Sequence, residues 1–301
     1  MTLLSRRTVS ASLLSLPLLG ACQSKTEPDT AAWTARLESI EANRGGRIGV
    51  AALDLQSSRM LIHRADERFA MCSTFKWMLG GVVLARVEAG DETLSRAVSI
   101  DEADMVFHAP TTEPAIGSTL TVAQLCAATI ANSDNPATNL LLESMGGPDG
   151  FTRALRAMED AVTRLDRYEP QLNANLPDDP RDTTTPLAMV ELMARLVFGD
   201  ILNSASRQIL QDWMLGAVTG EGRLKAGLPD GWRLGHKTGT SNRDANNDVG
   251  FALPPIGQPA GSARGPVLIV SFSDGPGAMT DVAETAHADV ARVVMDAFAQ
   301  T

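Results

Sequence analysis

The chain has 301 residues, of which 44% are hydrophobic and 21% are charged, and its formal net charge is −10. This is an ordinary globular composition, and the length suffices for one large domain or two interlocked ones. An acidic chain has no electrostatic reason to bind nucleic acid or an anionic membrane surface, so those partners are excluded. No apolar run reaches the roughly 20 residues of a membrane-spanning helix.

Residues 1–22 resemble an export signal rather than part of the fold. Arg6 and Arg7 precede an apolar stretch over 9–19, which is too short to span a bilayer. The arginine pair resembles a twin-arginine signal and predicts export to the periplasm. Removal of two arginines and no acids changes the net charge from −10 to −12.

The end of this segment leaves two alternatives for anchoring. Leu-Gly-Ala-Cys at 19–22 resembles a lipoprotein signal, in which Cys22 would be lipidated and become the new N-terminus. The alternative is an ordinary secretory signal cut near Ala21, with Cys22 incidental. Residues 23–31 are polar and would form a linker.

The first predicted elements are a helix and a hairpin. Apolar residues recur at helical spacing over 32–45, which predicts an opening helix. Two short runs, 47–55 and 60–63, flank a polar turn and predict two paired strands.

Helices dominate the middle of the chain. Thr74 to Ala89 is apolar nearly all round, which predicts a buried helix. Thr121 with Gln124 forms a capping box for a helix that runs to about Asn132. Further helices are predicted at 136–145, 148–158, 186–198 and 204–217. Residues 165–184 show no periodicity, and a connection of that length inside a compact domain is usually functional.

Strands return after Gly231, at 233–238, 248–253 and 267–273, and a helix over 283–300 ends the chain. Strands at both ends of a helical middle predict an α/β (α+β) fold, with an antiparallel sheet flanked by helices and an inserted all-α domain. The predicted α/β domain comprises 32–68 and 218–301, and the all-α domain comprises 69–217. The active site is expected in the cleft between them.

Four short motifs occur in order along the chain: Ser-Thr-Phe-Lys at 73–76, Ser-Asp-Asn at 133–135, Glu-Pro-Gln-Leu-Asn at 169–173 and Lys-Thr-Gly-Thr at 237–240. Each is weak alone, since S-x-x-K occurs about once by chance in a chain this long. Their order, spacing and settings together make chance assembly improbable.

The settings fit nucleophilic catalysis. A serine hydroxyl needs a base within hydrogen-bond reach, and Lys76 lies one helical turn beyond Ser73. The helix N-terminus favours negative charge at an attacked carbonyl. Ser133, on a turn between helices, could pass a proton to a departing nitrogen. Lys237 and Thr238 suit a substrate carboxylate, and a strand glycine allows close approach of a ligand.

The set S-x-x-K, S-D-N and K-T-G resembles the signature of class A β-lactamases and penicillin-binding proteins, over about residues 32 to 299. The resemblance implies that Ser73 forms an acyl-enzyme with a β-lactam, that Lys76 and Glu169 share the general-base work and that Ser133 relays a proton. Which of Lys76 and Glu169 serves acylation stays open. The implied protein is a monomer without a cofactor that confers antibiotic resistance.

The same resemblance implies a set of substrate-binding residues: Asn135, Asn173, Lys237, Thr238, Gly239 and Thr240. The backbone amides of Ser73 and Thr240 would form the oxyanion hole. His108 falls where the family often has an aromatic residue at the cleft rim. Arg223 resembles an arginine that grips the substrate carboxylate in some members, the alternative being an ordinary surface arginine.

Two alternatives to the hydrolase are a penicillin-binding peptidase or receptor and a non-catalytic lipoprotein. Glu169 and Asn173 of the long loop are spaced to hold one water, and penicillin-binding transpeptidases lack this pair. The intact set of Ser73, Lys76 and Ser133 argues against the non-catalytic lipoprotein. By resemblance, Arg167 and Asp182 close the loop.

Cysteine and histidine usage favours neither a disulfide nor a metal site. The positions that would partner Cys126 and Cys72 in the family are Gly80 and Ser241, so both thiols are expected to be free. The four histidines form no ligand-spaced pair, which argues against zinc.

Overall fold

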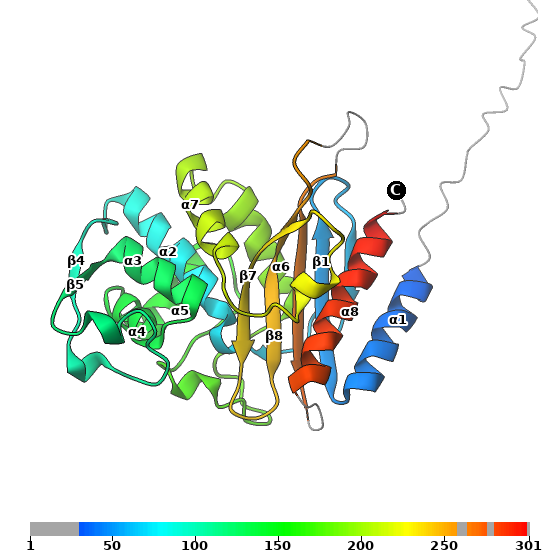
Figure 1. The fold of residues 1–301 in the computed structure, drawn as a ribbon, viewed down its shortest axis with the longest axis horizontal. Coiled ribbons are helices and arrows are strands. Elements are labelled where there is room, and N and C mark those ends of the chain that lie inside the picture. The colour runs from blue at the N-terminus through cyan, green and yellow to red at the C-terminus, as the bar shows by residue number, and fades with distance from the viewer. Residues whose placement is uncertain (1–29, 258–263, 276–279, 300–301) are drawn as a thin grey trace, which may run out of the picture.

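The computed structural model describes residues 30–257, 264–275 and 280–299. The predicted export signal, with Cys22, lies outside these residues. The described chain forms an antiparallel sheet with helices on both faces, and a group of helices extends beyond one edge of the sheet (Figure 1). Among the described helices, none combines the length and apolarity needed to cross a bilayer.

The main sheet has the strand order β2-β1-β9-β8-β7, and every neighbouring pair is antiparallel. Its strands are β1 (Arg47–Asp54), β2 (Met60–His63), β7 (Arg233–Thr240), β8 (Asn246–Leu253) and β9 (Val267–Asp274). β8 and β9 are buried along nearly their whole length because helices cover both faces. β7 is an edge strand, and in its register Thr238 lies opposite Asp248.

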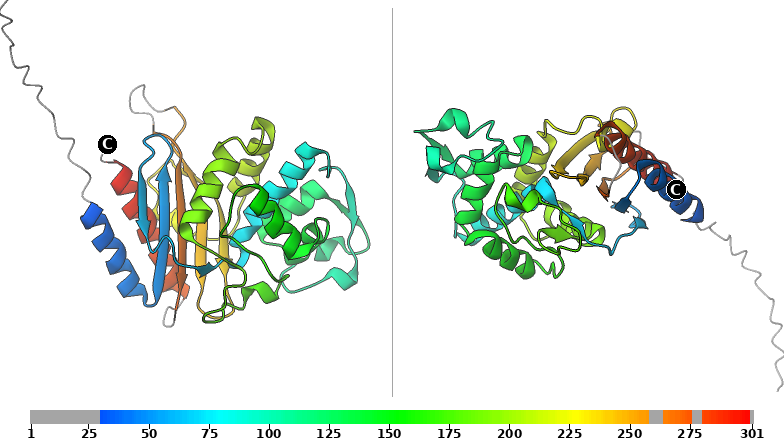
Figure 2. Two further views of the ribbon diagram at one scale, coloured as in Figure 1. Left: turned by 180° about the vertical axis from the view of Figure 1, so that it is seen from behind. Right: turned by 90° about the horizontal axis from the view of Figure 1, so that it is seen from below.

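One face of the sheet is covered by the two terminal helices. α1 (Thr30–Arg44) and α8 (Thr280–Ala299) lie side by side (Figures 1 and 2). Their apolar residues, such as Leu37 and Val294, pack against Val50 and Ile269 of the sheet. Segments from the two ends of the chain therefore build one core layer.

The other face and the edge beside β7 carry the remaining helices: α2 (Lys76–Ala89), α3 (Val122–Ala127), α4 (Asn135–Glu143), α5 (Gly147–Ala157), α6 (Pro186–Met193) and α7 (Ser204–Leu215). α6 packs on β1 and β9, and α7 packs on β7. α2 runs through the middle of this layer, with Trp77, Met78 and Leu79 fully buried. It ends at Gly90, whose φ of 82° is the left-handed conformation typical of a helix C-terminus.

The predicted element order is confirmed, with differences at the ends of elements. The predicted helix at Thr74 begins as a 3₁₀ turn over Cys72–Phe75, and the helix after Thr121 finishes as a π-helix over Ala128–Asn132. The Thr121–Gln124 capping box is present. A second π-helix (Ala194–Phe198) extends α6, and further 3₁₀ turns lie at Glu102–Asp104, Glu113–Ala115, Gln171–Asn173 and Leu224–Gly227.

Four very short strands were not predicted. β3 (Phe69–Ala70) pairs with β6 (Thr183–Thr184), and β4 (Ala97–Ser99) pairs with β5 (Thr119–Thr121). Two or three residues carry no readable periodicity, and their pairing is decided by distant segments. The β3–β6 pair joins the segment before Ser73 to the end of the 165–184 loop.

Candidate active site

Ser73 lies on a tight turn between β3 and α2. Residues 72–75 form the 3₁₀ turn, in which Cys72 has a φ of 47°. A non-glycine residue in this left-handed region costs on the order of 1–3 kcal/mol and persists only where its surroundings hold it. Asn247 of β8 helps to hold it, because its Nδ2 donates to the carbonyl oxygen of Met71 at 3.2 Å. The turn leaves Ser73 half-buried at the base of α2.

Lys76 is fully buried and lies among acceptor oxygens from two segments, the Ser-Asp-Asn turn at 133–135 and the loop that carries Glu169. Its Nζ is 2.9 Å from Glu169 Oε1, 2.6 Å from Asn135 Oδ1 and 3.3 Å from Ser133 Oγ. Burial lowers the pKa of Lys76 from its usual value, and the neighbouring Glu169 carboxylate opposes that shift. A lysine with a lowered pKa gives up its proton more readily than one in water, and only the neutral amine can act as a base.

Glu169 contacts both Ser73 and Asn173, the loop residue that the sequence predicts as its partner. Its Oε1 is 3.5 Å from Ser73 Oγ, and its Oε2 accepts a hydrogen bond of 2.6 Å from Asn173 Nδ2. The Oδ1 of Asn173 is buried and receives no hydrogen bond from any described group. Buried acceptors normally have a donor, so this atom is suited to a water or a substrate group.

The backbone of Glu169 is held by a residue that sequence reasoning missed. Asn139 of α4 donates from Nδ2 to the Glu169 carbonyl oxygen and accepts from the Glu169 amide at Oδ1, both at 3.0 Å. Asn139 lies four residues, about one helical turn, after Asn135. This spacing could have identified Asn139 from the sequence, because it places the side-chain amides of Asn135 and Asn139 on the same side of α4.

The predicted closure of the 165–184 loop is confirmed. Arg167 Nε donates to Asp182 Oδ2, and Asp182 Oδ1 accepts from the backbone amides of Asp166 and Arg167 at 2.7 and 3.0 Å. Desolvation raises the pKa of Asp182 against the effect of these donors. The two ends of the loop are thereby joined, which fixes the segment that carries Glu169.

The Ser-Asp-Asn motif forms the turn between the π-helix and α4. Ser133 has a φ of 62°, and Asp134 caps α4 by accepting from the Ala137 amide at 3.0 Å. Asp134 also accepts from the Thr112 amide at 2.9 Å, which ties the neighbouring loop to the motif. The buried Asn135 donates from Nδ2 to the Phe107 carbonyl oxygen at 2.7 Å.

The motif on β7 lies against the nucleophile turn. A Cβ added to Gly239 would come within 2.6 Å of the Met71 carbonyl oxygen, so only glycine permits this approach. Lys237 is buried and donates to the Thr238 carbonyl oxygen at 2.9 Å. Burial, with the charge of Lys76 nearby, lowers the pKa of Lys237 well below its usual value. The Thr238 hydroxyl is 2.8 Å from that of Thr219.

Arg223 is a buried arginine beside this strand rather than a surface one. Its side chain is 7% exposed, and it donates to the Asn247 carbonyl oxygen at 2.8 Å and to Thr240 Oγ1 at 3.0 Å. Glu284 of α8 is 3.4 Å away. The guanidinium therefore lies against the Thr240 hydroxyl of β7, and Arg223 is not an ordinary surface arginine.

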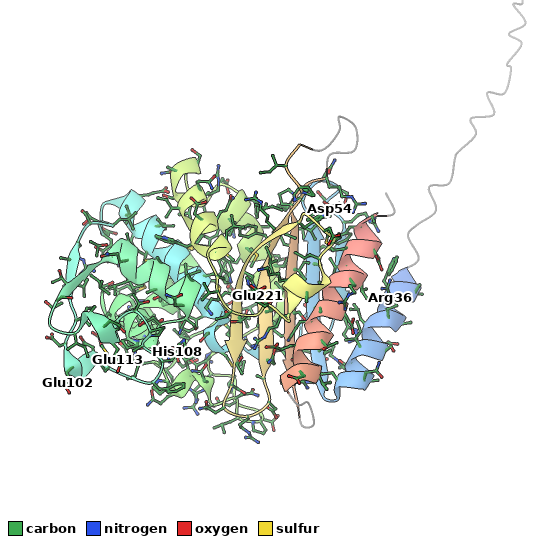
Figure 3. All side chains as sticks on the ribbon, in the orientation of Figure 1. Arg36, Asp54, Glu102, His108, Glu113 and Glu221 are labelled. Atoms are coloured by element: carbon green, nitrogen blue, oxygen red, sulfur yellow. The ribbon has the colours of Figure 1, made fainter. Side chains whose placement is uncertain are left out.

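His108 lies on an exposed loop of the helical region (Figure 3). Its Nε2 is 2.9 Å from the Asn132 carbonyl oxygen, and its own carbonyl oxygen accepts from the Asn135 amide at 3.0 Å. The adjacent Phe107 is 82% exposed. The backbone of His108 thus joins the Ser-Asp-Asn turn, and its ring stays at the surface.

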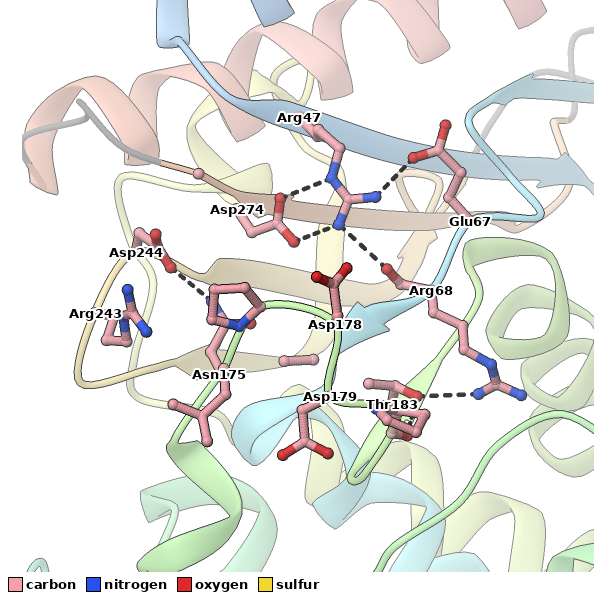
Figure 4. Close-up of a pocket in the computed structure, with 15 residues that line it drawn as sticks. Arg47, Glu67, Arg68, Asn175, Asp178, Asp179, Thr183, Arg243, Asp244 and Asp274 are labelled. Atoms are coloured by element: carbon pink, nitrogen blue, oxygen red, sulfur yellow. Dashed lines mark hydrogen bonds and ion pairs between the residues drawn. The ribbon is translucent and has the colours of Figure 1, made fainter.

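A cavity of about 680 Å³ lies beside loop residues 175–180, and none of the motif residues lines it (Figure 4). Three of its charged groups pair with each other, since Arg47 bonds Asp274 at 2.7 Å and Glu67 at 2.7 Å. Within the described residues, no group of three or more histidine, cysteine or acidic side chains could hold a metal ion.

Both cysteines of the described chain are free and buried, as expected. Burial raises the pKa of each thiol far above its usual value. Cys72 packs with Ala70 and Ala245 behind the nucleophile turn.

Comparison with known proteins gives one consistent result. A family model described as the β-lactamase enzyme family matches residues 32–298. The chain is similar to β-lactamase L2 of Stenotrophomonas maltophilia, with 46% identity over 252 residues, covering 82% of this chain and 83% of the relative. It is also similar to β-lactamase CTX-M-8 of Citrobacter amalonaticus, with 39% identity, covering 87% and 88%.

Two solved structures agree with these relatives. The class A β-lactamase of the last common ancestor of Gram-negative bacteria has a TM-score of 0.85 and 46% identity, covering 89% of this chain and 99% of that one. A β-lactamase from Xanthomonas campestris has a TM-score of 0.84 and 41% identity, covering 89% and 98%.

Proposed function

The chain belongs to the β-lactamase enzyme family, and from this membership we propose how its residues divide the work of opening and hydrolysing a β-lactam ring. The overall reaction is that of a class A serine β-lactamase, which confers resistance to β-lactam antibiotics. The observation that carries the proposal is the position of Glu169, whose carboxylate reaches the Ser73 hydroxyl, the Lys76 ammonium and the Asn173 amide.

In the first step, Ser73 Oγ attacks the lactam carbonyl carbon. The hydroxyl proton passes to Lys76 or Glu169, both of which remain candidates for the acylation base. The backbone amides of Ser73 and Thr240 stabilise the oxyanion. The carbon–nitrogen bond then breaks, and Ser133 passes a proton to the leaving nitrogen. The 3.3 Å contact of Lys76 Nζ with Ser133 Oγ supports a proton route between the base and the relay.

In the second step, a water hydrolyses the ester. Glu169 takes a proton from the water as its oxygen attacks the acyl carbon, and Ser73 leaves as a hydroxyl when the proton returns to it. Glu169 Oε2 and the unsatisfied Oδ1 of Asn173 offer acceptors that would position this water. This step separates a hydrolase from a penicillin-binding protein, which forms the same ester without turning it over.

The substrate is bound by the edge strand β7 and by residues that lie beside it. Lys237, Thr238, Thr240 and the buried Arg223 hold the substrate carboxylate, because cations and hydroxyls gather there. Asn135 and the backbone of the edge strand β7 at Gly239 receive the substrate amide. His108 lies at the rim and contacts the substrate side chain.

Export and organisation are proposed from the sequence. A twin-arginine signal would deliver the chain to the periplasm, where Cys22 would anchor it as a lipoprotein. The mature enzyme would act as a monomer, with an α/β domain over 32–68 and 218–301 and an all-α domain over 69–217.

Peptide mapping tests the assignment of the nucleophile. The protein is mixed with a penicillin, quenched in acid within a second and digested, and the labelled peptide is identified by mass. The added mass is expected on Ser73. A label on any other residue would contradict the proposed roles.

A further inference from the structure

A buried histidine–carboxylate pair joins the substrate-binding strand β7 to its neighbour β8. His236 precedes Lys237 on β7, and its Nδ1 is 2.8 Å from Asp248 Oδ1 on β8. His236 is 2% exposed and Asp248 is fully buried. A carboxylate oxygen next to a ring nitrogen acts as acceptor, so Nδ1 is assigned as the donor. No step of the proposed reaction uses this pair.

The second oxygen of Asp248 holds a different segment. Oδ2 accepts from the Leu224 amide at 3.2 Å, and Leu224 immediately follows Arg223. One carboxylate therefore links β7 to the segment that carries the buried arginine. Burying a carboxylate is costly unless its oxygens are satisfied, and here each oxygen has one defined donor.

The same segment packs closely on the strand. A Cβ added at Gly220 would lie 2.5 Å from Thr238 Cγ2 and 3.2 Å from His236 Cε1. Alternation along β7 places His236, Thr238 and Thr240 on one face of the sheet. The His236 side chain, which contacts Asp248, therefore lies on the same face of the sheet as the contact between Arg223 and Thr240.

We propose that Asp248 and His236 are positioning residues that fix Arg223 against Thr240, and so determine the affinity for the carboxylate of the β-lactam. Their effect falls on carboxylate binding and leaves the acid-base groups around Ser73 unchanged. The proposal rests on the carboxylate-binding role given to Arg223, so the experiment tests that role separately.

The test uses a chromogenic cephalosporin, which carries a carboxylate, and phenylboronic acid, which bonds to the catalytic serine and carries none. Hydrogen bonds to charged groups contribute enough for Asp248→Asn and His236→Ala each to raise KM about tenfold. The kcat should stay within about threefold, and the inhibition constant of phenylboronic acid should not change. His236→Asn keeps an N–H donor near Nδ1 and should restore most of the lost affinity.

The matched control is His63→Ala, which removes another histidine–carboxylate contact, with Glu41 at 3.2 Å, at the far edge of the sheet. It should leave KM unchanged. A purely structural role would lower the melting temperature of the Asp248 and His236 variants with KM intact, and that result overturns the proposal. An equal loss of phenylboronic acid affinity also overturns it, because it indicates general distortion.

A double-mutant cycle separates this inference from the role of Arg223. Arg223→Ala alone should raise KM for the cephalosporin, and Asp248→Asn should add little in that background, because both act through one group. A full additional effect overturns the positioning role. An unchanged KM in the Arg223→Ala variant would contradict the carboxylate-binding role of Arg223 itself. If Asp248→Asn does not fold, the two His236 variants carry the comparison.

Discussion

Lys76 and Glu169 form an ion pair of 2.9 Å in which both side chains are fully buried. Charges in such a site are stabilised only by their close partners, so removal of one leaves the other uncompensated. The pair lies beside Ser73: while both groups are charged, the Glu169 carboxylate can accept the hydroxyl proton, and Lys76 can accept it only after passing its own proton to Glu169. The Glu169 carboxylate opposes the lowering of the Lys76 pKa by burial, so a change at Glu169 changes how readily Lys76 loses its proton.

Ser73→Ala should abolish both hydrolysis and covalent labelling. Removing the nucleophile leaves no oxygen to form the ester, while loss of one half-buried hydroxyl should leave the fold intact. Intact mass after penicillin treatment and a thermal melt check both parts. Acylation of this variant would show that another residue is the nucleophile.

Asn139→Ala should lower both stability and turnover. The change removes the two 3.0 Å hydrogen bonds to the Glu169 backbone, and an orphaned buried partner costs about 1–3 kcal/mol. Misplacement of Glu169 should lower the deacylation rate more than the acylation rate. Urea denaturation and rapid-quench kinetics measure the two effects, and Asn43→Ala on α1 is the control. Equal slowing of both steps would contradict the positioning role.

His287 should make the fold less stable in acid. Its Nε2 is 2.9 Å from the Asn246 carbonyl oxygen, so Nε2 donates, and Nδ1 accepts from the Ser271 hydroxyl at 2.7 Å. Complete burial lowers its pKa from 6.5 to about 3. Because the unfolded chain binds the proton more readily, stability falls as pH drops from about 6.5 towards 3, by up to about 1.4 kcal/mol per pH unit.

His287→Gln removes this titration and should flatten the stability profile in that window. Urea denaturation at pH 7, 6, 5 and 4 provides the comparison. The fixed loss of stability from the substitution does not depend on pH, so the slope is the readout. Equal slopes in the two proteins would show that His287 does not titrate between the folded and unfolded states.

The two described thiols should be protected in the native protein. Burial of Cys72 and Cys126 raises their thiol pKa, which suppresses the reactive thiolate. In a Cys22→Ser chain, a thiol reagent should react slowly before denaturation and with two thiols afterwards, without reductant. Failure to find two thiols after denaturation would indicate oxidation.

The motifs could be predicted because their chemistry depends on local spacing. Ser73 and Lys76 share one helix start, and Glu169 and Asn173 share one short turn. Asp248, in contrast, contacts His236 and the Leu224 amide, which come from separate segments. The first contact depends on the register of β7 and β8 and the second on the packing of a 3₁₀ turn, and neither can be read from local spacing in the sequence.

Glu169→Ala is the variant that tests the hydrolytic role most directly, with Glu191→Ala on α6 as a control. A positioned carboxylate contributes roughly 10²–10⁴-fold to proton transfer from water, so the acyl-enzyme should form and then persist. Intact mass after mixing with penicillin should show one added substrate per chain for minutes to hours, while the control returns to the free mass at the wild-type rate. Turnover of the Glu169→Ala variant at the wild-type rate would contradict the account, because another group would then have to activate the water.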